Sequence, residues 1–228
     1  MARPLEIFVL DDCIWTYGGS LPRLPVPELH GCLARDYEFL GVAGDRSLQA
    51  DFLASLLVNY DFNHQNGTHR EMFRVVSCTV PKFEQDGHRA RVEMQLIRAA
   101  NTAAEFVKNP ALALLPKQMS NTLEYAFPST TVLFADVPFG RLAQVHIVYP
   151  ETANRTRTFI LLYGRIANSL LKRLLRKSLL AAASQVVEQD ARAVESLYPR
   201  EKPGVRLAKD EIMAYAERLF REWPLVSP

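Results

Sequence analysis

Alternation of apolar and polar residues is the dominant pattern in the middle of the chain. In RARVEMQLIR, residues 89–98, the apolar side chains alternate with charged or polar ones. The same period of two is found in five further segments: Met72–Val80, Leu123–Phe127, Thr131–Ala135, Ala143–Tyr149 and Thr156–Tyr163. Because successive side chains of a strand point to opposite faces, and the connections are short, this pattern predicts an antiparallel sheet.

Segments with helical spacing precede and follow this sheet. One is predicted from Ser47 to about Asn66, where Gly67 ends it. Its apolar positions are Leu48, Phe52, Leu56 and Tyr60. A long helix is predicted over residues 168–198 and an amphipathic one over residues 208–223. The pattern therefore predicts an α+β domain in which helices close over one face of an antiparallel sheet.

The N-terminal region has a different character. LEIFVLDDCIWTYGG, residues 5–19, predicts a pair of strands around Asp11 and Asp12. The next segment, SLPRLPVPEL, is too rich in proline for a helix or a central strand and is expected to be an extended connector. The apolar stretch Ile7–Leu10 is too short for a signal sequence, and no apolar run is long enough to span a bilayer. We expect a cytoplasmic protein that does not bind membranes.

Composition narrows the range of partners. The 27 basic and 25 acidic residues leave a net charge of only +2, far from the concentrated positive charge typical of nucleic-acid binding. The three cysteines, Cys13, Cys32 and Cys78, are widely spaced and odd in number. They are expected to be reduced thiols, not part of a disulfide framework.

The candidate chemistry lies in NYDFNHQNGTHREMF, residues 59–73. This segment contains Asp61, His64 and His69 in the order Asp-x2-His-x4-His. On a helix, Asp61 and His64 would share one face, and the break at Gly67 would allow His69 to turn back toward them. Two imidazoles and one carboxylate with open coordination positions form the facial triad of non-haem Fe(II) oxygenases. The alternative, a pair of surface or capping histidines, remains open at this point.

The segment resembles the iron-binding motif of the Rieske non-haem iron aromatic-ring-hydroxylating oxygenases. In that family an aspartate on a long C-terminal helix completes the triad, and here QVVEQDARAVESL supplies Asp190. The stretch LDDCIWTYGG is similar to the exit from the family's Rieske domain, and YAERLFREW is similar to its C-terminal ending. The chain therefore resembles the alpha-subunit catalytic domain of the vanillate demethylase and phenoxybenzoate dioxygenase type.

The resemblance implies a fold and a role for each site residue. The expected fold is a helix-grip domain, an antiparallel sheet wrapped around a long C-terminal helix. His64, His69 and Asp190 would bind Fe(II), and Asp61 would be the bridge for electron transfer that also orients His64. Residues 1–30 would be the strands and connector that follow a missing Rieske domain, and residues 31–228 would be the mononuclear iron domain.

The Rieske cluster itself has no ligands in these 228 residues. The family holds this 2Fe–2S cluster with Cys-x-His and a later Cys-x-x-His, whereas His30-Gly31-Cys32 has the wrong order and no second cysteine nearby. The resemblance thus implies an external Rieske or ferredoxin-type electron donor, which would receive its electrons indirectly from NAD(P)H through a reductase. It also implies a possible homotrimer and a small aromatic or apolar substrate that is hydroxylated or oxidatively demethylated.

Two other functions remain open from the sequence. The chain could be a non-catalytic helix-grip remnant that binds a ligand or acts as an assembly subunit. The retention of Asp61, which the family needs for electron transfer, argues against this interpretation. A zinc hydrolase with the same three ligands is less favoured, because no general base is evident beside the motif.

Overall fold

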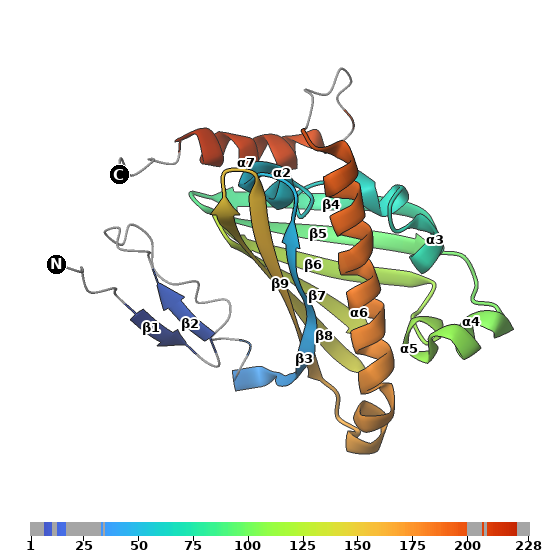
Figure 1. Ribbon diagram of the computed structural model, residues 1–228. Coiled ribbons are helices and arrows are strands. Elements are labelled where there is room, and N and C mark those ends of the chain that lie inside the picture. The colour runs from blue at the N-terminus through green and yellow to red at the C-terminus, as the bar shows by residue number, and fades with distance from the viewer. Residues whose placement is uncertain are drawn as a thin grey trace.

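A seven-stranded antiparallel sheet forms the centre of the protein, which we describe from a computed structural model (Figure 1). The structure describes residues 7–10, 13–16, 33, 35–199, 207 and 209–222. The strands have the order β3-β9-β8-β7-β6-β5-β4, so that only β3 is out of sequence, at the edge beside β9. Their bounds are β3 Glu38–Leu48, β4 Val75–Asp86, β5 Arg89–Arg98, β6 Gln118–Ala126, β7 Thr130–Val137, β8 Gly140–Thr152 and β9 Arg155–Arg165.

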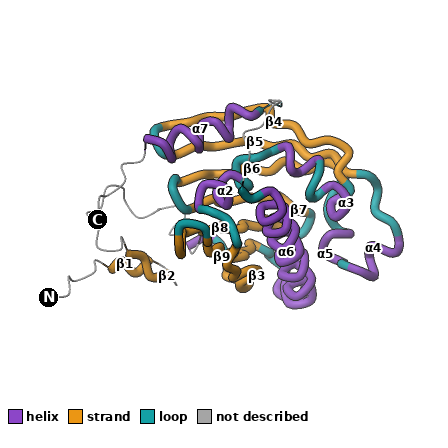
Figure 2. The backbone as a smooth tube through the Cα atoms, turned by 45° about the horizontal axis from the view of Figure 1, so that its top comes forward, coloured by secondary structure: helices purple, strands orange, loops and turns teal. Residues whose placement is uncertain are grey.

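The helices lie on one face of this sheet. The long helix α6, Ser169–Leu197, crosses the strands, and the sheet curves around it in Figure 2. The amphipathic helix α7, Asp210–Glu222, packs with α2 against the other end of the sheet. The short helices are α2 Phe52–Leu57, η1 Asn63–Asn66, α3 Arg70–Phe73, α4 Ala103–Lys108 and α5 Pro110–Ala113. This architecture confirms the predicted α+β helix-grip fold.

Alternating burial explains why the strands form where the sequence predicts them. In β5 the residues at positions 90, 92, 94 and 96 are buried and their neighbours are exposed or half-buried, and β9 repeats this pattern. The inward side chains of β9 pack with those of β3 against α6 through Leu175, Leu179, Ala183 and Val187. Burial of this apolar surface stabilises the pairing of helix and sheet by roughly 25 cal/mol for each Å² removed from water.

Helix α6 approaches the sheet closely near its middle. A Cβ atom built on Gly44 of β3 would lie 2.9 Å from Cγ1 of Val187, closer than real Cβ contacts come. The absence of a side chain at Gly44 therefore allows α6 to pack this near to β3. Val187 lies about one helical turn before Asp190 on α6. The contact with Gly44 therefore also sets how close Asp190 comes to the sheet.

The predicted helix at residues 47–66 is wrong in most of its length. Strand β3 continues to Leu48 and pairs it with Thr156 of β9, so the first apolar residue of the supposed helical stripe belongs to a strand. Helix α2 starts only at Phe52, where the carboxylate of Asp51 accepts a hydrogen bond from the amide of Ala54 at 2.7 Å. Pairing across the sheet, which local spacing does not reveal, decided this boundary.

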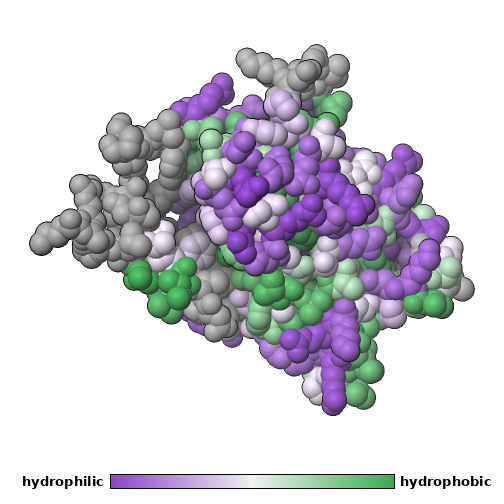
Figure 3. Space-filling view, in the orientation of Figure 1, coloured by the Kyte–Doolittle hydropathy of each residue, from purple (hydrophilic) through white to green (hydrophobic). Residues whose placement is uncertain are grey.

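The N-terminal strand pair is confirmed. β1, Ile7–Leu10, and β2, Cys13–Thr16, pair antiparallel, with Ile7 opposite Thr16. Their side chains form a hydrophobic patch in Figure 3, with Val9 76% and Ile14 75% exposed. Asp11, Asp12 and the proline-rich connector lie outside the described residues, and the division into residues 1–30 and 31–228 stays a prediction. None of the helices that the structure describes is long and apolar enough to cross a membrane.

Candidate metal centre

The two histidines lie on a tight turn that follows α2. The carboxylate of Asp61 accepts a hydrogen bond from the amide of Asn63 at 2.9 Å, which starts the single turn of η1 that contains His64. Gly67 ends η1, and His69 then caps α3. Asp61 and His64 thus do not share a regular α-helix, but the break at Gly67 turns His69 back toward His64 as expected. The two ring centroids are 5.0 Å apart.

Asp190 on α6 faces both histidines. Its Oδ1 atom lies 2.9 Å from Nε2 of His69 and 3.8 Å from Nε2 of His64. One potential ligand atom from each of the three residues lies within 4.8 Å of the others. The structure therefore brings together two histidines from one turn and an aspartate that is more than a hundred residues away in the chain.

Hydrogen bonds to the outer nitrogens orient both rings. Nδ1 of His64 donates to the backbone carbonyl of Asp61, and Nδ1 of His69 donates to Oε1 of Gln189 at 2.8 Å. These bonds select the tautomer in which Nε2 carries the lone pair. For His64 the amide of Gln65 donates to this lone pair at 3.0 Å. The Nε2 atom of His69 thus lies directly against Asp190, whereas Nε2 of His64 lies between the Gln65 amide and Asp190.

Burial and charge act differently on the two histidines. Burial lowers the pKa of His64, and this effect outweighs the opposing charge of Asp190. Burial also disfavours the charged form of His69, but contact with the Asp190 carboxylate and the hydrogen bond to Gln189 together raise its pKa. The carboxylate therefore stabilises positive charge close to His69, in a position where that side chain is only 1% exposed.

The three side chains fit a divalent metal ion. Within the described part of the chain, His69 Nε2 and Asp190 Oδ1 are both buried without a hydrogen bond of normal geometry. Histidine lone pairs and a carboxylate oxygen are all acceptors, so they repel one another at this distance unless a proton or a cation lies between them. Two imidazole nitrogens with one carboxylate oxygen are a typical donor set for Fe(II), with Zn(II) as a common alternative.

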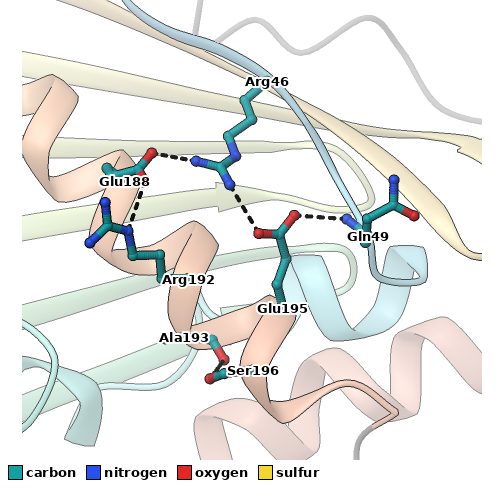
Figure 4. A network of polar contacts seen from close by, with 7 residues as sticks. All are labelled: Arg46, Gln49, Glu188, Arg192, Ala193, Glu195 and Ser196. Atoms are coloured by element: carbon teal, nitrogen blue, oxygen red, sulfur yellow. Dashed lines mark hydrogen bonds and ion pairs between the residues drawn. The ribbon is translucent and has the colours of Figure 1, made fainter.

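An ion-pair network holds this part of α6 against β3. Arg46 of β3 lies between Glu188 and Glu195, contacting both carboxylates, at 2.9 Å for Glu195 (Figure 4). Glu195 also accepts a hydrogen bond from the backbone amide of Gln49 at 3.0 Å, and Glu188 pairs with Arg192 at 2.8 Å. Because Glu188 immediately precedes Gln189 and Asp190, the network resists rotation of the helix that would withdraw these two side chains from the histidines.

A cavity of about 160 Å³ adjoins the three residues, between α6 and the inner face of the sheet. Most of its wall is apolar, with Leu and Met side chains from β5, β6, β7 and β8 and small residues of α6. The polar residues in the wall include Asn121, Gln144 and His146, besides Asp61 and the three clustered residues. Met94 and Leu96 of β5 are among the apolar residues of the wall.

Two residues at the site lie outside the motif that the sequence singled out. His146 of β8 lines the cavity, and burial lowers its pKa to about 4. Gln189 was not considered, although it precedes Asp190 directly and orients His69. Its role had no sequence signal beyond that adjacency, because Gln185, Glu188 and Gln189 are all ordinary residues for a polar helix face.

The described features define a class of protein: a helix-grip domain that encloses an apolar cavity beside two histidines and an aspartate. Residues 45–221 match the family model of the vanillate O-demethylase oxygenase C-terminal domain. The chain therefore belongs to this family, which confirms the resemblance seen in the sequence and gives the chain an oxygenase-domain role. None of the curated proteins matches the chain in sequence.

Solved structures share the fold. Dicamba monooxygenase bound to dicamba is 18% identical with a TM-score of 0.72, and the match covers 97% of this chain and 71% of that chain. Dicamba monooxygenase with non-heme iron and dicamba is 19% identical with a TM-score of 0.60, over 97% and 70%. NdmB of Pseudomonas putida CBB5 is 16% identical with a TM-score of 0.59, over 96% and 60%. At such low identity these similarities establish the common fold.

Proposed function

We propose that this domain binds one Fe(II) ion through His64, His69 and Asp190 and uses O2 to hydroxylate or oxidatively demethylate an aromatic or similarly apolar substrate. The observation that carries the proposal is the convergence of three side chains that can ligate a metal, one buried and two half-buried, on one point beside an apolar cavity. A carboxylate facing two imidazole lone pairs has no evident structural purpose without a cation, because an apolar cluster would stabilise the fold more.

The protein's own contribution is to hold the ligand side chains and the substrate in position and to exclude bulk water. When bound, the iron would supply the redox chemistry that activates O2. The backbone carbonyl of Asp61 and the side chain of Gln189 hold the two imidazole rings in the orientation that metal binding requires. The apolar walls orient a ring-shaped substrate and keep bulk water away from the reacting atoms.

Electrons would come from a Rieske-type 2Fe–2S centre outside these 228 residues. Asp61 is the residue proposed to bridge that donor to the site, since it contacts His64 directly. The hydrogen bond in the structure runs from His64 to the Asp61 carbonyl, while the Asp61 carboxylate accepts from the Asn63 amide. Asp61 is half-buried in the wall of the cavity, so it lies between the site and the outer part of the turn.

Metal content tests the proposal most directly. We expect about one iron per chain in protein purified anaerobically or reconstituted with Fe(II), because the triad offers one set of ligands. His64→Ala and Asp190→Ala should lose the iron, and His88→Ala, which changes a histidine in the turn between β4 and β5, should keep it. Wild-type protein that takes up no iron after reconstitution would refute the oxygenase proposal.

The role of Asp61 needs a separate experiment. Asp61→Asn preserves an oxygen that can accept from the Asn63 amide but removes the negative charge, so iron content should stay unchanged. Turnover driven by a Rieske protein should fall at least about tenfold if the charge assists electron transfer, a difference of roughly 1.4 kcal/mol. Turnover driven by hydrogen peroxide, which brings oxygen and reducing equivalents together, should not change. Equal losses in both assays would show that Asp61 does not serve the electron path.

A ligand-binding protein without catalysis is the second candidate. The apolar cavity is the observation that favours it, since helix-grip walls of this kind can hold a ligand without a metal. It predicts that a ligand binds equally well to wild-type protein and to Asp190→Ala, and that neither retains iron.

A further inference from the structure

Asn121 is a polar residue in an otherwise apolar part of the cavity wall. This residue of β6 is 7% exposed, lines the cavity, and has no hydrogen-bond partner for Oδ1 among the described residues. Its neighbours across the sheet are Met94 and Ala135, and the inward residues before and after it on β6 are Met119 and Leu123. A buried amide oxygen without a partner costs about 1–3 kcal/mol, so a group that donates to it would bind favourably.

Two polar residues of the wall on β8 are paired with each other. The side-chain amide of Gln144 donates to Nε2 of His146 at 2.8 Å, so these two satisfy each other on β8. Thr131 lies opposite His146 in the sheet, and therefore belongs to the same polar group. Asn121 is separated from this group along the strands, since it lies opposite Ala135 of β7, four residues from Thr131. The unsatisfied acceptor is thus a distinct point of the wall.

The charge of the cavity disfavours an anionic ligand. The described residues that line the cavity include two carboxylates, Asp61 and Asp190, but no lysine or arginine. A divalent metal would only neutralise these two charges, so a bound carboxylate would add an uncompensated negative charge in a buried place. Burial of an unpaired charge is far more costly than burial of a neutral polar group.

The size of the cavity indicates a single ring. Its volume is about 160 Å³. An engineered apolar cavity of roughly 150 Å³ in another protein holds benzene. Six-membered rings with one or two small substituents therefore match the space, while fused or linked rings do not without movement of α5 or α6.

We propose that the cavity takes a neutral, monocyclic aromatic molecule with a hydrogen-bond donor, such as a phenol, and that Asn121 recognises the donor through Oδ1. This inference rests on the proposed function, for which it names the substrate class. The ring would lie among the Leu and Met side chains of the sheet, and the hydroxyl group would donate to the unpaired Oδ1 of Asn121. Asn121 is then a specificity residue for the reaction.

Three probes of one ring size test the proposal: 4-methylphenol, 4-methylanisole and 4-methylbenzoate. Their affinity is measured by calorimetry under anaerobic conditions, for protein with and without Fe(II), in four forms. These are wild type, Asn121→Leu, Asn121→Asp and Ser120→Ala. Ser120 is the neighbouring residue of β6 and is exposed on the opposite face of the sheet, so its variant is the matched control.

We expect wild type and Ser120→Ala to bind 4-methylphenol at least about tenfold more tightly than either other probe, the factor that corresponds to a buried acceptor left unpaired. Asn121→Leu should keep its affinity for 4-methylanisole and lose the preference for the phenol. Asn121→Asp, which retains the acceptor, should keep that preference.

Several results would overturn the inference: equal or tighter binding of the benzoate, a phenol preference that persists in Asn121→Leu, or no binding of any probe to folded wild-type protein. The outcome is separable from that of the proposed function. Phenol preference without iron uptake would leave a phenol-binding protein, whereas iron uptake without phenol preference would refute only the role of Asn121.

Discussion

The hydrogen bond between Gln189 and His69 should contribute measurably to metal affinity. Gln189→Ala removes the acceptor for Nδ1 of His69, a side chain that is 1% exposed and therefore cannot exchange the lost bond for one to water. Leaving such a donor unpaired costs about 1–3 kcal/mol. Most of this free-energy cost falls on the metal-bound state, because metal binding requires one orientation of the His69 ring, whereas the ring of the metal-free protein can turn. The expected loss is roughly ten- to hundredfold in affinity.

Competition between the protein and a chelator for Fe(II), followed anaerobically by the chelator's absorbance, measures this loss. Gln189→Glu keeps an acceptor and should bind iron at least as tightly as wild type. Gln185→Ala, an exposed glutamine one turn earlier on α6, is the matched control and should show no change. An unchanged affinity in Gln189→Ala, or an equal loss in Gln189→Glu, would refute the view that this hydrogen bond positions His69.

Two further predictions concern packing and pH. Gly44→Ala places a Cβ atom 2.9 Å from Val187, so we expect a loss of about 1–3 kcal/mol in unfolding free energy by chemical denaturation. Val187→Ala in the same chain should recover part of it, and additive losses would contradict the contact. Burial lowers the pKa of His146 from its ordinary value to about 4, so the unfolded chain binds a proton there before the folded protein does. The metal-free protein should lose up to about 3 kcal/mol between pH 6.5 and 4, and His146→Gln should weaken that dependence. The same dependence of unfolding free energy on pH in wild type and His146→Gln would contradict this role of His146.

Much of the fold could be predicted from local pattern. The strands from β5 to β9 and the helices α6 and α7 lie close to their predicted positions, because each buries one regular face and its period is visible in the residues. Strand β3 was missed, and its end was read as helix. Gly41 and Gly44 interrupt the apolar alternation of this strand, and its pairing partner β9 lies more than a hundred residues further along the chain.

The candidate site, like the fold, was predicted in part from the sequence and decided in part by the tertiary structure. The sequence alone singled out the candidate residues: Asp61, His64 and His69 stand in one short motif, and the family resemblance added Asp190. Their roles as iron ligands and electron bridge remain predictions that metal analysis will test. The sequence also determined that no Rieske cluster ligands accompany them, since the required pairs of cysteine and histidine do not occur in the 228 residues.

The tertiary structure decided everything that depends on distance across the chain. Only the packing of α6 on the sheet shows that Asp190 lies 2.9 Å from His69, that Gln189 orients this ring, and that Asn121 is left unpaired in an apolar wall. These features arise from the depth and rotation of one helix, which Gly44 and the Arg46 network set. Periodicity reports which face of an element is buried, but it contains no information on which residue of another element that face will meet.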